Sequence, residues 1–244
     1  MFSAYSNLQT QRRTRQLTCI ILLVTIGFVT VVILYEKPKD EIDMNQQPII
    51  PNVIHCFPDI CQNSKRDIMQ EGDKIQNSFE KIYRDRLWGN SGEGSGHGSE
   101  PAHTITTRLI MEMVIYKYHI SSLLDAPCGA IKWTRVLLAK IFSTIPCFKY
   151  YGVDVVRPVI QNLTEEFKLF ENLEFSTLDI SNLNITLPQA DLILSRDALQ
   201  HLPYENIVNV IENYAKSHSK YLIVGSYPTG KNRNINIGMT FYPS

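Results

Sequence analysis

The sequence predicts an α/β domain with a doubly wound, mostly parallel sheet, preceded by one transmembrane helix. After residue 120, short apolar runs alternate with helix-length segments. Strands that read as continuous apolar runs are typical of a parallel sheet covered by helices on both faces. Residues 17–35 carry no charge at all. The chain of 244 residues is 44% apolar, which is enough to bury one good core.

The charge balance and the cysteine spacing exclude several classes of function. Lys+Arg and Asp+Glu each number 24, so the formal net charge is zero. Without a global basic field we expect no nucleic-acid partner. The five cysteines lack the paired C-x-x-C spacing that a zinc site requires, so we expect no metal site.

The uncharged segment at residues 17–35 reads LTCIILLVTIGFVTVVILY. As a helix it would span about 28 Å, against a hydrocarbon core of about 30 Å, so it predicts one transmembrane helix. A cleaved signal peptide is the alternative. Its apolar region would be shorter and followed by small residues, whereas Glu-Lys-Pro-Lys follows here at 36–39. We therefore expect an uncleaved signal anchor.

The basic residues around this segment give its expected orientation. Three precede the segment and two follow it: Arg12, Arg13, Arg15, and then Lys37 and Lys39. An excess of basic residues marks the cytosolic side. We therefore expect a cytosolic tail at residues 1–16 and a single-pass, type II membrane protein whose body is lumenal or extracellular.

Two regions lie between the anchor and the α/β domain. Residues 36–64 carry four prolines and little apolar periodicity, which indicates a stalk. Cys56 and Cys61 near its end could close a small disulfide if the body is lumenal. Residues 65–119 form a helical N-terminal extension, with helical periodicity at 66–88 and again at 101–118.

A glycine-rich loop at residues 89–99 separates the two helices of this extension. Gly92, Gly94, Gly96 and Gly98 occupy every second position. This composition predicts a mobile loop.

The α/β domain itself occupies residues 120–244. Its predicted strands are SSLLD (121–125), FKYYGVD (148–154), LEFSTLD (173–179), ADLILS (190–195) and YLIVGS (221–226). The helix-length segments between them lie at about 132–144, 157–170 and 203–217. Ligands of such sheets bind outside the carboxyl ends of the strands, where we look for the functional residues.

Three successive predicted strands end on aspartate, at Asp125, Asp154 and Asp179. A carboxylate at this edge can accept hydrogen bonds from a ligand that lies across the sheet. Aspartate is also a common residue at strand ends and helix caps, so a purely structural role stays open for each. The phosphate-binding patterns GxxxxGK[ST] and GxGxxG are absent, which argues against an NTPase or a dehydrogenase.

The fourth predicted strand leads into a polar segment at residues 195–203. Asp197 and His201 lie four residues apart and would share one face of a helical turn, as an acid/base pair would require. In the alternative reading, Asp197 caps a helix and His201 is a hydrogen-bonded turn residue.

Residues 121–226 resemble the class I S-adenosylmethionine-dependent methyltransferase domain, which is Rossmann-like. Within that class the chain resembles a group of small DAPCG-type methyltransferase-domain proteins, over about residues 80–240. The residues that carry this resemblance are Trp88-Gly89, the glycine-rich loop, Leu124-Asp125-Ala126-Pro127-Cys128-Gly129, Trp133, Gly152-Val153-Asp154, Ser195-Arg196-Asp197 and His201-Leu202.

The resemblance implies S-adenosyl-L-methionine as the cofactor and a set of residues that bind it: Asp125, Ala126, Pro127, Cys128, Gly129, Asp154, Val155, Asp179, Ile180 and Arg196. In this family pattern the loop 125–129 passes beneath the methionine portion. Asp154 holds the ribose hydroxyls, and Asp179 with Ile180 borders the adenine. Arg196 and Asp197 stand beside the sulfonium and the incoming substrate.

The function implied by the resemblance is methyl transfer to an unidentified acceptor by a membrane-anchored transferase. Asp197 or His201 would be the catalytic residue that accepts the substrate proton. The alternatives are a catalytically inactive methyltransferase-fold interaction module and a purely structural lumenal body. Few residues follow the run 221–226, so we expect the usual seven-stranded sheet to be incomplete at its C-terminal edge.

The predicted strands place Cys128 and Cys147 at opposite ends of the sheet. Cys128 would lie past the carboxyl end of the first strand, and Cys147 would precede the amino end of its neighbour. A strand length of about 15–20 Å would separate them, far beyond the roughly 7 Å limit for a disulfide. We therefore expect Cys128 and Cys147 to be free.

The predicted topology can be tested in sealed microsomes. If residues 17–35 are an uncleaved type II anchor, protease added outside the vesicles should leave the body from Pro38 onward intact, because the membrane shields it. Immunoblotting for a C-terminal epitope measures this, with detergent-opened vesicles as the control. Digestion of the body in sealed vesicles would reverse the orientation.

Overall fold

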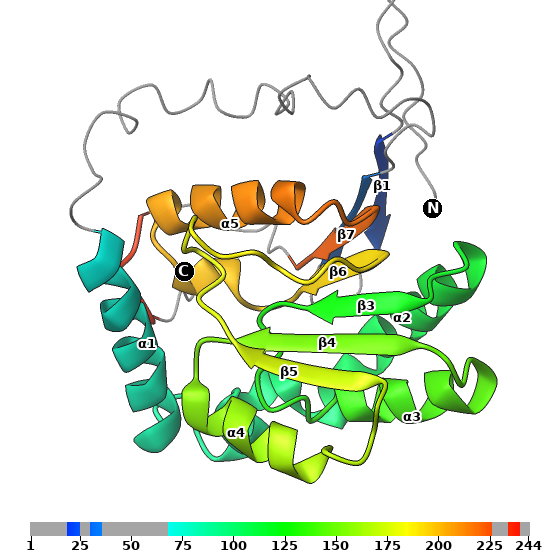
Figure 1. Cartoon of the computed structure of the whole chain (residues 1–244), viewed down its shortest axis with the longest axis horizontal. Helices are drawn as coiled ribbons and strands as arrows, with labels where there is room; N and C mark the ends of the chain where they lie inside the picture. Colours follow the sequence, from blue (N-terminus) through cyan, green and yellow to red (C-terminus); the bar gives the residue numbers. More distant parts are fainter. Residues whose placement is uncertain (1–18, 25–29, 36–67, 226–233, 240–244) are drawn as a thin grey trace, which may run out of the picture.

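The computed structural model describes residues 19–24, 30–35, 68–225 and 234–239 (Figure 1). Within them, five parallel strands form the main sheet: β3 (Ser122–Asp125), β4 (Lys149–Asp154), β5 (Leu173–Thr177), β6 (Leu192–Ser195) and β7 (Tyr221–Val224). Their order in space is β5-β4-β3-β6-β7, and every neighbouring pair is parallel. The predicted α/β fold is confirmed. In the described residues no strand of this sheet follows β7.

The strand order reverses beside β3. From β3 the chain moves outward to β4 and β5, and then returns to the other side of β3 to form β6 and β7. At such a switch point the two connections leave in opposite directions, which opens a crevice at the carboxyl ends of the strands. This crevice is where the sequence places the three aspartates.

The helices cover the sheet as the sequence predicts. Their bounds are α1 (Ile68–Arg84), α2 (Ile105–Lys117), α3 (Thr134–Thr144), α4 (Arg157–Glu166) and α5 (Tyr204–Lys216). Figure 1 shows α3 and α4 on one side of the sheet and α5 on the other, while α1 stands across the ends toward which the strand arrows point.

Alternation along the central strand divides the core into two halves. Leu123 and Leu124 are both fully buried, but they belong to different hydrophobic clusters because consecutive side chains of a strand point to opposite faces. Leu123 packs with residues of α2, α3 and α4, and Leu124 with residues of α5 such as Val210. Burial on both faces explains why the strands read as continuous apolar runs.

The transmembrane helix predicted at residues 17–35 is not confirmed. The structure describes two antiparallel strands in this segment, β1 (Cys19–Val24) and β2 (Thr30–Tyr35), with β2 beside β7 (Figure 1). The segment is rich in Val, Ile and Thr, whose branched side chains favour extended backbone. Within the described ranges no helix is long and apolar enough to cross a membrane. The predicted tail at 1–16 and stalk at 36–64, with Cys56 and Cys61, lie outside the described residues.

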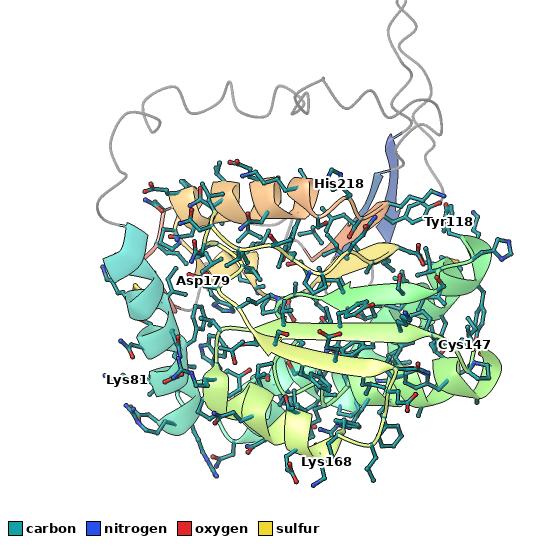
Figure 2. All side chains as sticks on the ribbon, viewed as in Figure 1. Lys81, Tyr118, Cys147, Lys168, Asp179 and His218 are labelled. Carbon is teal, nitrogen blue, oxygen red and sulfur yellow. The ribbon has the colours of Figure 1, made fainter. Side chains whose placement is uncertain are left out.

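Cys128 and Cys147 are both free, as predicted. Cys128 follows β3 at the carboxyl edge of the sheet and is buried, whereas Cys147 precedes β4 and is exposed. Figure 2 shows Cys147 at the opposite end of the sheet from Asp179.

The glycine-rich loop lies over the edge of the sheet, where hydrogen bonds join it to the α/β domain. It contains two short 3-10 turns, η2 (Ser91–Gly94) and η3 (His97–Ser99). Four glycines supply positive φ angles that other residues rarely adopt: Gly89, Gly92, Gly94 and Gly96. The N–H of Gly92 donates to Glu100 Oε1 (2.7 Å), and the Lys132 ammonium donates to the same oxygen (3.0 Å). Glu100 therefore links the backbone of the loop to Lys132, in the turn after β3.

Two glycines of similar backbone conformation test how closely the loop packs. A Cβ at Gly94 (φ +96°) would lie 2.7 Å from Tyr83 Cδ1, whereas a Cβ at Gly89 (φ +90°) would meet nothing within 4 Å. Both Ala variants are strained at φ, but only Gly94→Ala must displace the Tyr83 ring. We expect Gly94→Ala to lower the free energy of unfolding by about 1–3 kcal/mol more than Gly89→Ala, measured by denaturant titration. Equal losses would show that the loop does not pack on Tyr83.

Candidate active site

A cavity lies at the carboxyl edge of the sheet, over the switch point. It encloses about 860 Å³ of space, counting its open mouth. Residues that follow β3, β4, β5 and β6 form its floor, while α1 and the glycine-rich loop contribute the opposite wall.

Asp125 ends β3 and lies at the bottom of this cavity, 3% exposed. Its Oδ2 accepts hydrogen bonds from the Tyr150 hydroxyl (2.8 Å) and from Thr134 Oγ1 (3.2 Å). Burial raises the pKa of Asp125 to about 7, although the two hydrogen bonds oppose this shift.

Asp154 ends β4 and holds the turn that follows β3. Gly129 N donates to Asp154 Oδ2 and Val156 N donates to Asp154 Oδ1, both at 2.9 Å. The carboxyl group is 5% exposed, and burial raises its pKa although these bonds lower it. Gly129 has φ +57°, and a Cβ there would lie 2.7 Å from Ser95 Oγ. Only glycine fits between the Asp154 carboxylate and the loop above it.

Asp179 lies two residues beyond β5, which ends at Thr177 and not at Asp179 as the sequence predicted. The chain has already left the ladder there, because Leu178 N makes the last backbone bond to β4, with Asp154 O (3.0 Å). The N–H and the hydroxyl of Ser181 both donate to Asp179 Oδ1 (2.9 and 2.8 Å). Burial raises the pKa of Asp179 against these bonds. The side chain still lines the cavity, so the predicted position is right.

Arg196 and Asp197 follow β6 and form an ion pair at the cavity (Nη1 to Oδ2, 2.8 Å). The guanidinium lies over the Trp133 ring, 5.6 Å from its centroid, and Nη2 donates to Gly98 O (3.2 Å). Arg196 thereby joins the sheet edge to the glycine-rich loop, and its charge is balanced by Asp197.

His201 lines the same cavity and stacks on Trp88, with ring centroids 4.6 Å apart. His201 Nδ1 lies 3.1 Å from Met239 O, and a carbonyl oxygen can only accept, so Nδ1 carries the proton. Nε2 of the neutral ring is then available to accept a proton. Burial lowers the pKa of His201 below its usual value, which keeps the ring neutral at pH 7.

The structure does not contain the single helical turn that the sequence predicted for Asp197 and His201. Asp197 has φ +52°, outside the helical region, and the 3-10 turn η5 (Leu199–His201) begins only afterwards. Both side chains nevertheless line the cavity.

Eleven of the twelve predicted site residues line the cavity: Asp125, Pro127, Cys128, Gly129, Asp154, Val155, Asp179, Ile180, Arg196, Asp197 and His201. Ala126 is not among them. Its N–H donates to Leu194 O (2.9 Å) and its carbonyl accepts from the Tyr214 hydroxyl, so it ties the turn to β6 and α5 from behind.

Sequence reasoning missed the wall that α1 provides. Ile75, Phe79 and Tyr83 line the cavity together with Ser95 and Ser99 of the loop. The helical spacing of the first three placed them on one side of a helix, but nothing in the spacing says what that side covers. The Tyr83 hydroxyl and Ser95 Oγ are 2.7 Å apart, and Ala130 N donates to Ser95 Oγ (3.2 Å), so this wall rests directly on the turn after β3.

The composition of the cavity suits an organic ligand with hydroxyl groups and a positive charge. Carboxylates accept hydrogen bonds from hydroxyls, and aromatic rings such as Tyr83 and Trp88 attract cations. In the described part of the chain, no group of three or more His, Cys, Asp or Glu residues could hold a metal ion.

No protein-family model matches the chain, and neither does any curated protein sequence. Similar solved structures include the N-methyltransferase NodS from Bradyrhizobium japonicum WM9 with S-adenosyl-L-homocysteine (18% identity, 57% of this chain, 66% of that chain, TM-score 0.43). Another is the methyltransferase domain of bacterial CtHen1-C (14% identity, 48% and 63%, TM-score 0.42). A third is human N-acetylserotonin methyltransferase with S-adenosylmethionine (16% identity, 60% and 35%, TM-score 0.34).

The chain spans less than two thirds of the length of each of these three proteins, at no more than 18% identity. Their TM-scores all lie below 0.5.

The raised pKa of Asp125 predicts a pH dependence of stability. The folded protein keeps this proton at pH values where the unfolded chain has lost it, so the contribution to stability is full below about pH 4 and is lost as the pH rises through about 7. Between pH 5 and 8, wild type should therefore lose on the order of 1–3 kcal/mol more stability than Asp125→Asn. Asp191→Asn is the control, because the pKa of Asp191 is lowered and it does not titrate in this range. Parallel pH profiles for wild type and Asp125→Asn, in denaturant unfolding, would refute this.

Proposed function

We propose that this chain binds S-adenosyl-L-methionine in the cavity and transfers its methyl group to an acceptor. The observation that carries the proposal is the convergence of Asp125 and Asp154, which end β3 and β4, and Asp179, which follows β5, onto one cavity at the switch point. The residues of the cavity fit this cofactor, since carboxylates can accept hydrogen bonds from a ribose and aromatic rings can attract a cation. The sequence contains no phosphate-binding loop, and this cofactor needs none.

Asp154 would hold the ribose hydroxyls. Each of its carboxylate oxygens accepts one backbone N–H, and an ionised oxygen has a second lone pair to offer a hydroxyl. The same two bonds fix the carboxylate in place before a ligand arrives. A preorganised acceptor of this kind binds without loss of side-chain freedom.

The segment after β5 would border the adenine. Asp179 offers a carboxylate acceptor to the exocyclic amine, while Leu178 and Ile180 offer apolar surface to the ring. On the other side of Asp154, the turn 125–129 would lie beneath the methionine portion. Its Gly129 allows the backbone to approach closely.

When bound, the cofactor supplies a methyl carbon activated by a positive sulfonium. The chain's own contribution is to align the acceptor and to remove its proton. His201 Nε2 is the candidate base, because Nδ1 is committed to Met239 O and burial keeps the ring neutral. The Arg196–Asp197 ion pair at the cavity would orient the acceptor without adding net charge.

Membrane attachment is a separate proposal that rests on the sequence alone. We infer a single-pass anchor from the uncharged segment 17–35, and the body would then act on an acceptor on the lumenal or extracellular side.

The proposal predicts different effects for two aspartates at opposite edges of the sheet. Asp154→Ala should weaken S-adenosylhomocysteine binding at least about tenfold, because charge-assisted hydrogen bonds contribute on the order of 1.5–3 kcal/mol each. Asp191→Ala is the matched control. Asp191 lies at the amino edge, where it accepts bonds from the N–H groups of Ser121 (2.8 Å) and Ser122 (3.0 Å). Calorimetry of variants shown to be folded by circular dichroism measures both.

Equal affinities of the two variants would contradict a ligand that lies across the strand ends. Tight binding without any labelled product, in a screen with radiolabelled methyl donor, would favour the inactive interaction module over the enzyme.

A further inference from the structure

Two asparagines occupy the buried face of α5. Asn206 is 5% exposed and Asn213 is 2% exposed, and they share that face with Val210 and Tyr214. A helix that packs on a sheet normally buries apolar side chains there, since a buried amide is costly unless it is hydrogen-bonded. Both amides are bonded to the same short segment, the one that follows β5.

Asn213 holds the backbone of this segment at two points. Its Nδ2 donates one hydrogen to Ile180 O (2.8 Å) and the other to Asn182 O (2.9 Å). The two carbonyls fix the orientation of the amide, because a flipped amide would set Oδ1 against both of them. The turn is closed from within by Asn182 N, which donates to Asp179 O (3.0 Å).

Asn206 reaches Asp179 through Ser181. Asn206 Nδ2 donates to Ser181 Oγ (3.2 Å), and Ser181 donates from both its hydroxyl and its N–H to Asp179 Oδ1. Oδ1 therefore takes both bonds and is held in place. The second carboxylate oxygen, Oδ2, remains for a ligand in the cavity.

The two buried asparagines lower the stability of the fold, a loss that apolar side chains at the same positions would avoid. Asn213 Oδ1 is buried and, among the described residues, has no hydrogen-bond partner. Asparagine is also a poor helix former. Apolar side chains at both positions would cover the sheet without leaving a buried acceptor unpaired. What they could not do is fix the positions of Asp179 and Ile180.

We propose that Asn206 and Asn213 are positioning residues that give the site its selectivity for adenine. This inference rests on the proposed function. A 6-amino purine presents a donor to Asp179, whereas a 6-oxo purine presents an oxygen that repels the carboxylate. Discrimination between them needs an acceptor that cannot turn away, which is what the two amides provide.

The test compares two ligands on the full-length chain: S-adenosylhomocysteine and its 6-oxo analogue, S-inosylhomocysteine. Wild type should prefer the adenosyl compound by at least about tenfold. Asn213→Ala and Asn206→Ala should each reduce this preference to about threefold or less, because a loosened carboxylate can rotate away from the 6-oxo group. Ser217→Ala is the matched control. Ser217 is also buried, at the end of α5, but it bonds Tyr214 O and the Ser219 hydroxyl and not the segment 179–182.

The ratio of the two affinities separates positioning from general loosening, since loosening weakens both ligands alike. If the ratio stays at the wild-type value in both Asn variants, or falls equally in Ser217→Ala, the inference is overturned. A wild type that binds both ligands equally overturns it as well. A wild type that binds neither overturns the proposed function instead. Should Asn213→Ala fail to fold, Asn206→Ala, which loses one bond, decides alone.

Discussion

The buried carboxylate of Asp154 is the contact on which the site depends. By accepting the N–H groups of Gly129 and Val156 it joins the turn after β3 to the turn after β4. An ionised carboxylate is costly at this depth, and two backbone donors offset part of that cost. The bond to Gly129 sets the backbone on which Ser95 and Tyr83 rest, so the floor and the wall of the cavity are fixed together.

The helical extension and the glycine-rich loop are part of the site and not a linker to it. Three anchors hold the loop over the sheet edge: Glu100 through Gly92 and Lys132, Ser95 through Tyr83 and Ala130, and Gly98 through Arg196. Two of these anchors reach the turn between β3 and α3, through Lys132 and Ala130, and the third reaches Arg196 after β6. The helix α1 therefore faces the strand ends at a defined distance, and the cavity has a wall that the α/β domain alone would not give it.

The electrostatics of the cavity favour a ligand with positive charge. Burial raises the pKa values of Asp125, Asp154 and Asp179, which disfavours their ionised forms, and a cation bound beside them would oppose that effect. Among the described residues that line the cavity, the arginine is Arg196, which is already paired with Asp197 and adds no net charge. A sulfonium ligand would therefore lower the free-energy cost of ionising the three carboxyl groups, and its binding would stabilise the fold.

Within residues 68–225 the sequence by itself determined the helices and strands and the edge of the sheet that carries the site. Apolar runs and helical spacing are local properties, so they located the five strands of the main sheet and five helices, and adjacency to strand ends placed Asp125 and Asp154 at the carboxyl edge. Only the tertiary structure decided which surfaces meet. The periodicity of α1 could not say that Phe79 and Tyr83 face a cavity, the composition of the loop could not reveal its anchors, and β5 ended before Asp179 because the ladder with β4 ended first. The buried asparagines of α5 became intelligible only once the segment after β5 lay beneath them. Spacing along a chain fixes the period of an element, but the partner of each face depends on contacts between residues far apart in sequence.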